Sequence, residues 1–328
     1  SNTSSLYRTA PKLSINAAFQ IDSTTQKTTL NSRALPNQIK AIGVNRLFDY
    51  KQLQGLTREN IGDARILQER QKLVNAVDGN ITTDIKQWIT NRYFIVEKDW
   101  AKIERENWNQ VVKSLPKLAP KDTELEFLYV KRDFEPVFKL NGKECYLDEL
   151  SSGFKSFLVI IFSIVDWCEG IYEDENALLE NVQGTVLIDE IDAHLHPKWQ
   201  MTIIRTLKDL FPKLQFIVTT HSPHVIASAE ANEIIRIPQH NGTVELKPDA
   251  QSYQGWQLDF ILQDVMNMSN LFQADVQTSL ENLNKAYDDN DLESYDKYLD
   301  ELEHCLHPND SILKVYQLKK SNLLLTQP

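Results

Sequence analysis

Residues 184–190 form the stretch that decides the fold: Gly184-Thr185-Val186-Leu187-Ile188-Asp189-Glu190. A short apolar run with β-branched members predicts a strand that is buried on both faces, as in a parallel sheet. Two carboxylates follow at the C-terminal end of this strand, and open α/β sheets bind ligands outside that end. The stretch therefore predicts a parallel α/β sheet with a candidate site at its edge.

A second strand is predicted further along the chain, over Leu214–Thr220, and it leads directly into His221. An amphipathic helix predicted over Pro197–Phe211 separates the two strands. The order strand, helix, strand implies parallel neighbours, so we expect His221 on the same sheet edge as Asp189. Ser222 then suits the cap of a short following helix.

The third element lies upstream, where Leu150-Ser151-Ser152-Gly153-Phe154 opens an apolar stretch of helical length, 153–167. A small residue such as Gly153 lets the backbone approach a ligand closely. A helix N-terminus offers free N–H groups and positive potential to a phosphate, and Ser151 and Ser152 add hydroxyl donors. An ordinary serine N-cap is the alternative interpretation of this pentapeptide.

The acidic pair and the histidine have the chemistry that metal-dependent phosphate hydrolysis needs. Asp189 can hold Mg²⁺, usually through water, while Glu190 can polarise the attacking water. His221 can donate a hydrogen bond to a γ-phosphate. The bland alternatives are a strand that merely ends in acidic residues and a histidine that caps a strand end. The occurrence of all three elements in one chain favours the catalytic interpretation over these alternatives.

Along the chain, the segment Leu150–Phe154, the strand that ends in Asp189-Glu190, and His221 follow one another. This is the order of the signature loop, the Walker B strand and the switch histidine in the ABC-type ATPase superfamily, which the chain therefore resembles. The resemblance is to its soluble branch, which holds the chromosome-maintenance (SMC), RecF-like and overcoming-lysogenization-defect ATPases, and it covers roughly 121–250. It implies an ABC-type P-loop NTPase sheet with flanking helices, and ATP and Mg²⁺ as cofactors. In that superfamily the signature loop of one subunit closes on ATP held by another. The resemblance therefore implies a head-to-tail homodimer or a higher oligomer.

The segment Ile191–Pro197 lies where the superfamily has its D-loop, and the resemblance places Asp192, His194 and His196 at the nucleotide. Many members have Asp at the place that His196 takes here, and the His-Leu-His-Pro form is similar to the defence-associated branch. Metal binding by the two histidines is an alternative. The same spacing equally suits a turn into the helix 197–211.

No Gly-x-x-x-x-Gly-Lys-Ser/Thr motif occurs in the sequence. Gly142-Lys143 is followed by Glu144 in a predicted hairpin, whereas a P-loop needs a strand, a glycine-rich turn and a helix. We expect the P-loop segment upstream of Ser1, because the superfamily has it before the signature. A degenerate ATPase that uses a partner's P-loop is the alternative.

Changes of pattern along the chain predict four regions. They are the remainder of an N-terminal ATPase lobe (1–44), a helical insertion standing off the core (45–120), the ATPase core (121–250) and a C-terminal helical region (251–328). Further strands are predicted over Leu13–Ile21, Ile39–Val44, Ile234–Ile237 and Thr243–Leu246. Arg46 resembles an arginine that often follows this kind of strand in such ATPases, with a solvated arginine as the alternative.

The C-terminal region narrows the choice of ATPase. Gly255–Leu262 followed by a helical pair resembles the ATPase subunit of Septu-type anti-phage systems, which also accompanies some retrons. The resemblance implies an HNH nuclease partner and, in retron versions, a reverse transcriptase with its RNA–DNA hybrid. The alternatives are a RecF/SMC-like DNA-repair ATPase, a transporter subunit and a non-hydrolysing ATP-dependent scaffold. The acidic run 288–303 follows no predicted strand, which suits solvated helix faces better than a nuclease site.

The composition sets bounds on these functions. The chain has 328 residues, of which 41% are apolar, so it can bury a substantial core. No run approaches the roughly 18 apolar residues of a transmembrane helix. Its three scattered cysteines are typical of a reduced cytosolic protein, so we expect a cytoplasmic location and no membrane partner. A formal net charge of -11 argues against sequence-independent coating of nucleic acid.

Overall fold

The computed structural model divides the chain into two compact units, Ser1–Gly255 and Trp256–Pro328. The residues that it describes are 19–21, 28–30, 38–77, 83–119, 123–237, 247–268 and 272–326. No helix in these ranges is both long and apolar enough to cross a membrane. The predicted strand over Thr243–Leu246 and most of the one over Leu13–Ile21 lie outside the described residues. The finer division at 44/45, 120/121 and 250/251 stays a prediction.

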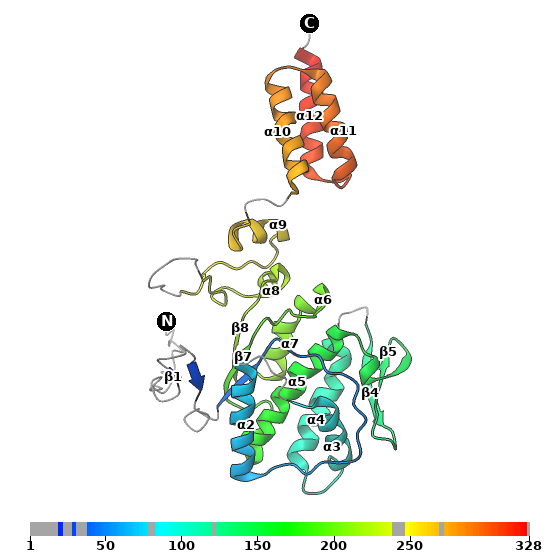
Figure 1. Cartoon of the computed structure of the whole chain (residues 1–328), viewed down its shortest axis with the longest axis vertical. Helices are drawn as coiled ribbons and strands as arrows, with labels where there is room; N and C mark the ends of the chain where they lie inside the picture. The colour runs from blue at the N-terminus through cyan, green and yellow to red at the C-terminus, as the bar shows by residue number, and fades with distance from the viewer. Residues whose placement is uncertain are drawn as a thin grey trace, which may run out of the picture. The chain divides into compact units, whose positions relative to one another are not determined.

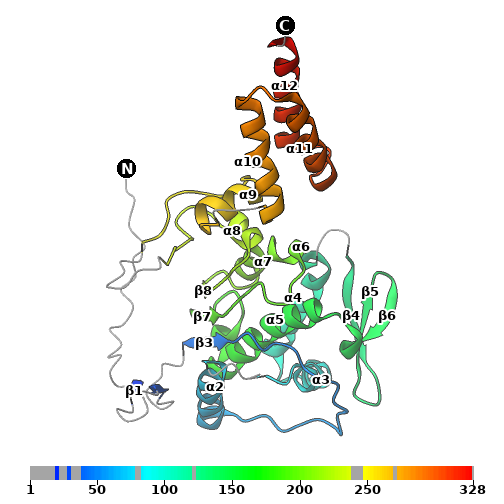
Figure 2. The ribbon, with the colours of Figure 1, turned by 45° about the horizontal axis from the view of Figure 1, so that its top comes forward.

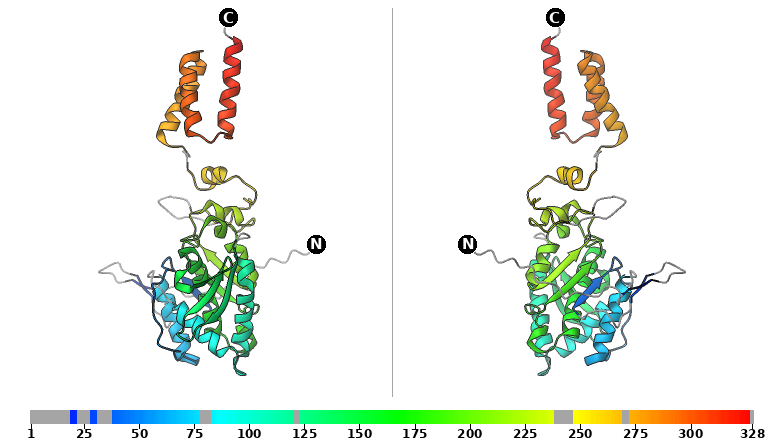
Figure 3. Two further views of the ribbon diagram at one scale, coloured as in Figure 1. Left: turned by 90° about the vertical axis from the view of Figure 1, so that its right-hand side faces the viewer. Right: turned by 90° about the vertical axis from the view of Figure 1, so that its left-hand side faces the viewer.

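The first unit is built on a parallel sheet of three strands in the order β3 (Ile39–Ile42), β7 (Gly184–Ile188) and β8 (Leu214–Val218). Figure 3 shows them side by side, and the same order is visible in Figure 2. Ile188 pairs with Ile42 on one side and with Val218 on the other. All three strands therefore end at one edge, and the predicted α/β class with a parallel sheet is confirmed.

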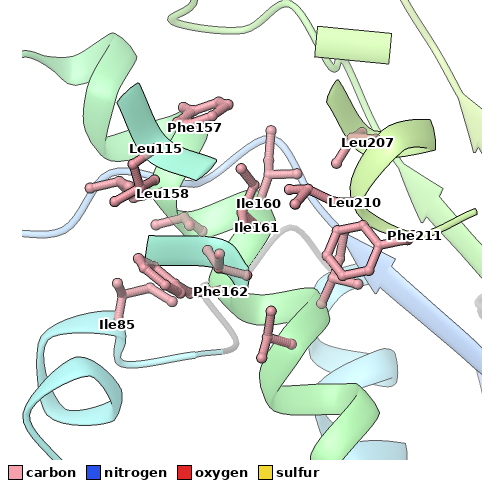
Figure 4. Packing of buried hydrophobic residues seen from close by; sticks show 14 of the residues in the cluster. Ile85, Leu115, Phe157, Leu158, Ile160, Ile161, Phe162, Leu207, Leu210 and Phe211 are labelled. Carbon is pink, nitrogen blue, oxygen red and sulfur yellow. The ribbon is translucent and has the colours of Figure 1, made fainter. Parts of the chain in front are cut away.

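Helix α5 (Ser152–Ile171) is the centre of the hydrophobic core. It is apolar on nearly all its sides, which is typical of a helix surrounded by other elements. Figure 4 shows Phe157, Ile160 and Phe162 of this helix among side chains from the neighbouring helices. Val186 and Ile188 of β7 belong to the same cluster, so α5 buries one face of the sheet.

The segment predicted to stand off the core does not do so. It forms α2 (Gly62–Val77), α3 (Ile85–Ile95) and α4 (Lys102–Leu118). Trp88 of α3 and Trp108 of α4 belong to the main cluster and lie against Phe162, with ring centroids 5.0 and 6.2 Å away. The prediction was wrong because the charged residues that give these helices a polar pattern include several that are buried in ion pairs.

A small antiparallel sheet precedes α5. Its strands are β4 (Leu125–Val130), β5 (Pro136–Leu140) and β6 (Lys143–Tyr146). The turn between β5 and β6 has positive φ at both Asn141 (50°) and Gly142 (81°), as a tight two-residue hairpin requires. Gly142-Lys143 thus belongs to a hairpin, as predicted. A short 3₁₀ helix, Leu147–Glu149, then leads into the predicted signature loop.

Two elements after β7 differ from the sequence prediction. The helix predicted over Pro197–Phe211 is split into α6 (Pro197–Gln200) and α7 (Ile203–Leu210). The hydroxyl of Thr202 donates to the carbonyl of Trp199 at 3.3 Å, and such local bonds compete with helix bonding. Ile234–Ile237 is not a strand: it makes a single isolated bridge, between Ile235 and Pro248.

The remaining elements of the first unit are short. Helix α8 spans Pro223–Ser228, and β1 (Phe19–Ile21) pairs antiparallel with β2 (Thr28–Leu30).

The second unit begins with α9 (Leu258–Phe260), which continues as a π-helical turn, Ile261–Val265.

Three longer helices complete the second unit: α10 (Ala274–Asp288), α11 (Leu292–Cys305) and α12 (Ser311–Thr326). They lie side by side in Figure 1 and share a small core of their own that includes Leu283, Tyr295, Leu299 and Leu313. Helices α10 and α11 are joined by a tight turn at residues 289–291, so they run antiparallel.

Helix α2 is attached to α5 by a cluster of buried charges. Asp166 of α5 accepts hydrogen bonds from Arg65 and from Lys72, the latter at 2.6 Å. Glu69 lies between Lys72 (2.7 Å) and Lys40 of β3 (3.4 Å). Burial by itself would raise the pKa of Asp166, but the surrounding cations, Lys72 first among them, lower it well below its usual range. The carboxylate therefore stays ionised inside the core.

Replacing Asp166 by Asn should destabilise the protein by about 3–5 kcal/mol, because the substitution leaves buried cations without a counter-charge. Because its pKa is lowered in the folded state, Asp166 stabilises the fold at pH values above its ordinary pKa of 3.8. This contribution is lost as the pH falls below that value. In urea unfolding, the gap between wild type and Asp166→Asn should thus be large at neutral pH and shrink toward pH ~3.

Asp209→Asn is the matched control, because Asp209 is exposed and its ion pair with the exposed Arg205 is long, at 3.8 Å. It should change the unfolding free energy by no more than about 0.5 kcal/mol. Equal stabilities of the two variants at neutral pH would contradict the assigned role of Asp166.

Candidate functional site

The sheet edge brings together the residues that follow β7 and β8. Because Ile188 is in register with Val218, the next residues, Asp189 and Thr219, are neighbours. The Thr219 hydroxyl donates to Asp189 Oδ1 at 2.6 Å and accepts from the Glu190 N–H at 2.7 Å. The side chains of Asp189 and Glu190 are exposed. Both carboxylates are therefore accessible to a ligand, and the Thr219 hydroxyl orients that of Asp189.

His221 also lies at this edge, two residues beyond Thr219, and it is exposed. The next residue, Ser222, is buried and caps α8: its hydroxyl oxygen accepts from His224 N at 3.1 Å and Val225 N at 3.4 Å. Pro223 occupies the first turn of this helix. The predicted cap and proline are thus present, and they hold the turn that carries His221.

Arg46 is not solvated but buried, with 1% of its surface exposed. Its Nη2 donates to the backbone carbonyls of Glu190 and, at 3.2 Å, of Asp189. Burial lowers the pKa of Arg46 to about 10, with the carboxylates of the site opposing the shift. That value is far above neutral, so the guanidinium remains a cation behind the acidic strand end.

Hydrogen bonds connect the predicted D-loop, Ile191–Pro197, to the switch turn, residues 219–223, which carries His221. The Thr220 hydroxyl donates to Asp192 Oδ1. Gln200 of α6 donates to the Leu195 carbonyl at 2.8 Å and accepts from the Ser222 hydroxyl at 2.7 Å. A displacement of one loop must therefore disturb the other.

The predicted signature loop contacts the D-loop in the same chain. Ser151 and Ser152 are exposed at the start of α5, while Gly153 is buried. A Cβ on Gly153 would lie 3.0 Å from the His194 carbonyl oxygen, so the close packing of the two backbones favours glycine here. Ser151 makes no side-chain capping bond, which speaks against the ordinary N-cap interpretation.

The two D-loop histidines differ in their surroundings. His196 is the N-cap of α6, where its Nδ1 accepts from Lys198 N at 3.3 Å. His194 is exposed and has a positive φ of 66°. No group of three His, Cys, Asp or Glu side chains in the described part of the chain could hold a metal ion. The turn into α6 is therefore the interpretation that the geometry supports.

Sequence reasoning missed three polar residues of the site: Thr219, Thr220 and Gln200. The two threonines end an apolar strand, as the carboxylates end β7, and this placement is the signal that could have revealed them. No comparable signal exists for Gln200, because its partners are set by the packing of α6 against the switch turn. A hollow of about 390 Å³ lies elsewhere, lined by residues of α10 and α11, and none of these carry the predicted chemistry.

A parallel α/β sheet that ends in an oriented Asp-Glu pair, with a histidine turn on the neighbouring strand, defines an ATPase. The chain belongs to the AAA ATPase domain family, whose model matches residues 12–226.

Two curated relatives make the assignment more specific. The chain is 29% identical to the Septu protein PtuA of Bacillus thuringiensis over 294 residues, which cover 87% of this chain and 72% of that protein. It is 43% identical to the Retron Vc95 probable ATPase of Vibrio cholerae serotype O1 biovar El Tor over 95 residues, 29% of this chain and 18% of that protein. The resemblance to ABC-type ATPases of the Septu and retron kind is thereby confirmed.

Among solved structures, a chain described under ATP-driven dimerization and DNA-stimulated activation of SMC ATPases is 17% identical. It covers 52% of this chain and 96% of its own length, with a TM-score of 0.35. This is a slight likeness, and the fold is defined by the sheet order and register of the chain itself.

Ser222→Ala should destabilise the protein by about 1–2 kcal/mol, because it removes the cap of α8 and leaves Gln200 without its donor. Ser228→Ala, at the other end of the same helix, is the control. Ser228 only donates back to the Val225 carbonyl, so its loss should cost no more than about 0.5 kcal/mol. Denaturant unfolding of both variants gives the comparison, and equal losses would contradict the link between the switch turn and α6.

Proposed function

We propose that this ATPase hydrolyses Mg-ATP at the edge formed by β7 and β8. The observation that carries the proposal is the parallel register that sets Asp189 and Glu190 beside the turn of His221. Thr219 engages Asp189 Oδ1, and the other oxygen of this carboxylate would hold Mg²⁺. Glu190 would orient the attacking water as general base, and His221 would donate to the γ-phosphate. A single exposed carboxylate fits this ion, because Mg²⁺ at nucleotide sites is held by one or two carboxylates together with the phosphates and waters, and needs no cluster of three protein ligands.

The active form is proposed to be a head-to-tail dimer or a higher oligomer. Ser151 and Ser152 are exposed at the N-terminus of the 20-residue helix α5, where N–H groups and hydroxyls suit a phosphate. Gly153, by contrast, is buried against the D-loop of its own chain, which counts against a direct contact of this residue with a partner's nucleotide. We therefore propose that Ser151 and Ser152 are the groups of the signature loop that meet the nucleotide of a partner subunit, with Asp192, His194 and His196 next to that interface.

The biological role proposed is that of the ATPase subunit in a cytoplasmic anti-phage defence complex. The Septu and retron relatives support it. We propose that the ATPase controls an HNH nuclease in trans, with a reverse transcriptase and its RNA–DNA hybrid as further partners in a retron setting. Helix α11 carries Glu293, Asp296, Asp300, Glu301 and Glu303. Their charge suits a basic, DNA-handling partner.

Glu190→Gln in the full-length protein should retain ATP while its turnover falls by about a hundredfold or more, because the amide cannot accept the proton of the attacking water. Steady-state phosphate release and nucleotide binding measure the two effects separately. Wild-type turnover in this variant would remove Glu190 from the mechanism. No turnover even in the wild type would favour the non-hydrolysing scaffold.

Deleting 275–328 tests the partner surface. These helices have their own core, so the ATPase unit should still fold and hydrolyse ATP. We expect an HNH nuclease encoded beside the ATPase to co-purify with the intact chain and to be lost on deletion. The double variant Asp300→Lys, Glu301→Lys should weaken the complex without unfolding α11, because both side chains are exposed. Asp209→Lys, in α7, is the matched charge reversal and should not weaken it.

Continued co-purification with the deleted protein, with the ATPase still dimeric, would rule out docking on these helices. A change of oligomeric state alone would mean that they extend the homodimer. Failure of the intact chain to retain any nuclease would remove most of the support for the defence role.

A further inference from the structure

We propose that Thr219 is a positioning residue for hydrolysis, whose hydroxyl sets the peptide between Asp189 and Glu190. The inference rests on the proposed function, since it assumes that these carboxylates act on Mg-ATP. Thr219 would contact neither ATP nor the attacking water, and it acts by holding Asp189 and Glu190 in place.

Thr219 contacts four consecutive residues at the end of β7. Its backbone N–H donates to the Ile188 carbonyl at 3.0 Å, and its carbonyl accepts from Ile191 N at 2.9 Å. Between these two bonds, its hydroxyl donates to Asp189 Oδ1 at 2.6 Å and accepts from Glu190 N at 2.7 Å. The backbone bonds extend the sheet ladder, whereas the hydroxyl bonds reach the acidic pair itself.

The turn at Glu190 needs such support because its backbone is in the left-handed region, with φ of 45°. That conformation is unfavourable for a residue with a Cβ. Both polar groups of the Asp189–Glu190 peptide are held by side chains: Thr219 accepts from its N–H, and Arg46 donates to its carbonyl at 3.2 Å. The peptide plane is thus clamped from β8 on one side and from the segment after β3 on the other.

This clamp determines where the two carboxylates point. The hydroxyl donates a hydrogen bond to Asp189 Oδ1, which fixes the rotamer of this carboxylate and leaves Oδ2 free of that bond. The bond from Glu190 N to the hydroxyl oxygen fixes the Cα position from which the Glu190 side chain extends. Loss of the hydroxyl should therefore misplace the groups that act in the chemical step more than those that bind nucleotide.

The test compares Thr219→Val with Thr219→Ser in the full-length ATPase. Valine keeps the branched shape and the backbone bonds but has no hydroxyl, whereas serine keeps the hydroxyl. We expect Thr219→Val to lower kcat about tenfold to a hundredfold with KM for ATP nearly unchanged, and Thr219→Ser to restore most of kcat. Thr219 is exposed, so the melting temperature of both variants should stay close to that of wild type.

Thr185→Val is the control, because Thr185 lies on β7 away from the acidic pair, and its hydroxyl donates to the Gln215 side chain at 3.3 Å. It should leave kcat and KM unchanged. A double variant then identifies the route of the effect: in the Glu190→Gln background, Thr219→Val should add much less than it does in wild type, because it acts through the same group.

Wild-type kcat in Thr219→Val, or an equal loss in Thr219→Ser, would overturn the positioning role. A fully multiplicative loss in the double variant would overturn the part of the proposal that runs through Glu190, and would leave Asp189 as the group through which Thr219 acts. These outcomes are distinct from failure of the proposed function, which would appear as normal turnover in Glu190→Gln alone.

Discussion

The parallel pairing of β7 with β8 is the constraint on which the site depends. Register between Ile188 and Val218 makes the residues that follow each strand neighbours, and it gives the Thr219 hydroxyl both the Asp189 carboxylate and the Glu190 amide as partners. A slip of one residue would turn the alternate side chains to the opposite face of the sheet. It would separate the acidic pair from the histidine turn, and no loop adjustment could restore the arrangement.

The core explains why this register is stable. Helix α5 is buried on nearly every side, so it packs against β7 on one side and against α3 and α4 on others. The burial of charges in the same region is compensated by pairing: Asp166 by cations of α2, and Arg92 by Glu169 at 2.7 Å. Removing one partner of such a pair is costly, whereas the intact pair adds specificity to how α2 and α3 attach.

The loops at the sheet edge form one connected unit. The signature segment meets the D-loop through Gly153 and the His194 carbonyl, and the D-loop meets the switch turn through Gln200 and Ser222. In the proposed head-to-tail arrangement, this connection would give the two nucleotide sites a physical route to influence each other. The route consists of a close backbone contact and partly buried hydrogen bonds, which respond to small displacements because closely packed atoms have little free volume around them.

The sequence by itself determined the elements and the order of the chemistry. The apolar run of β7, the turn at Asn141-Gly142 and the start of α8, with Ser222 as cap and Pro223 in the first turn, follow from local preferences that need no distant partner. The identity of Asp189, Glu190 and His221 as edge residues follows from strand ends. Only the tertiary structure decided that α3 and α4 belong to the core, that Arg46 is buried behind the acidic pair, and that Thr219 holds it. These facts depend on contacts between residues far apart in the chain, and a buried ion pair or a strand-end threonine has the same local pattern as a solvated one.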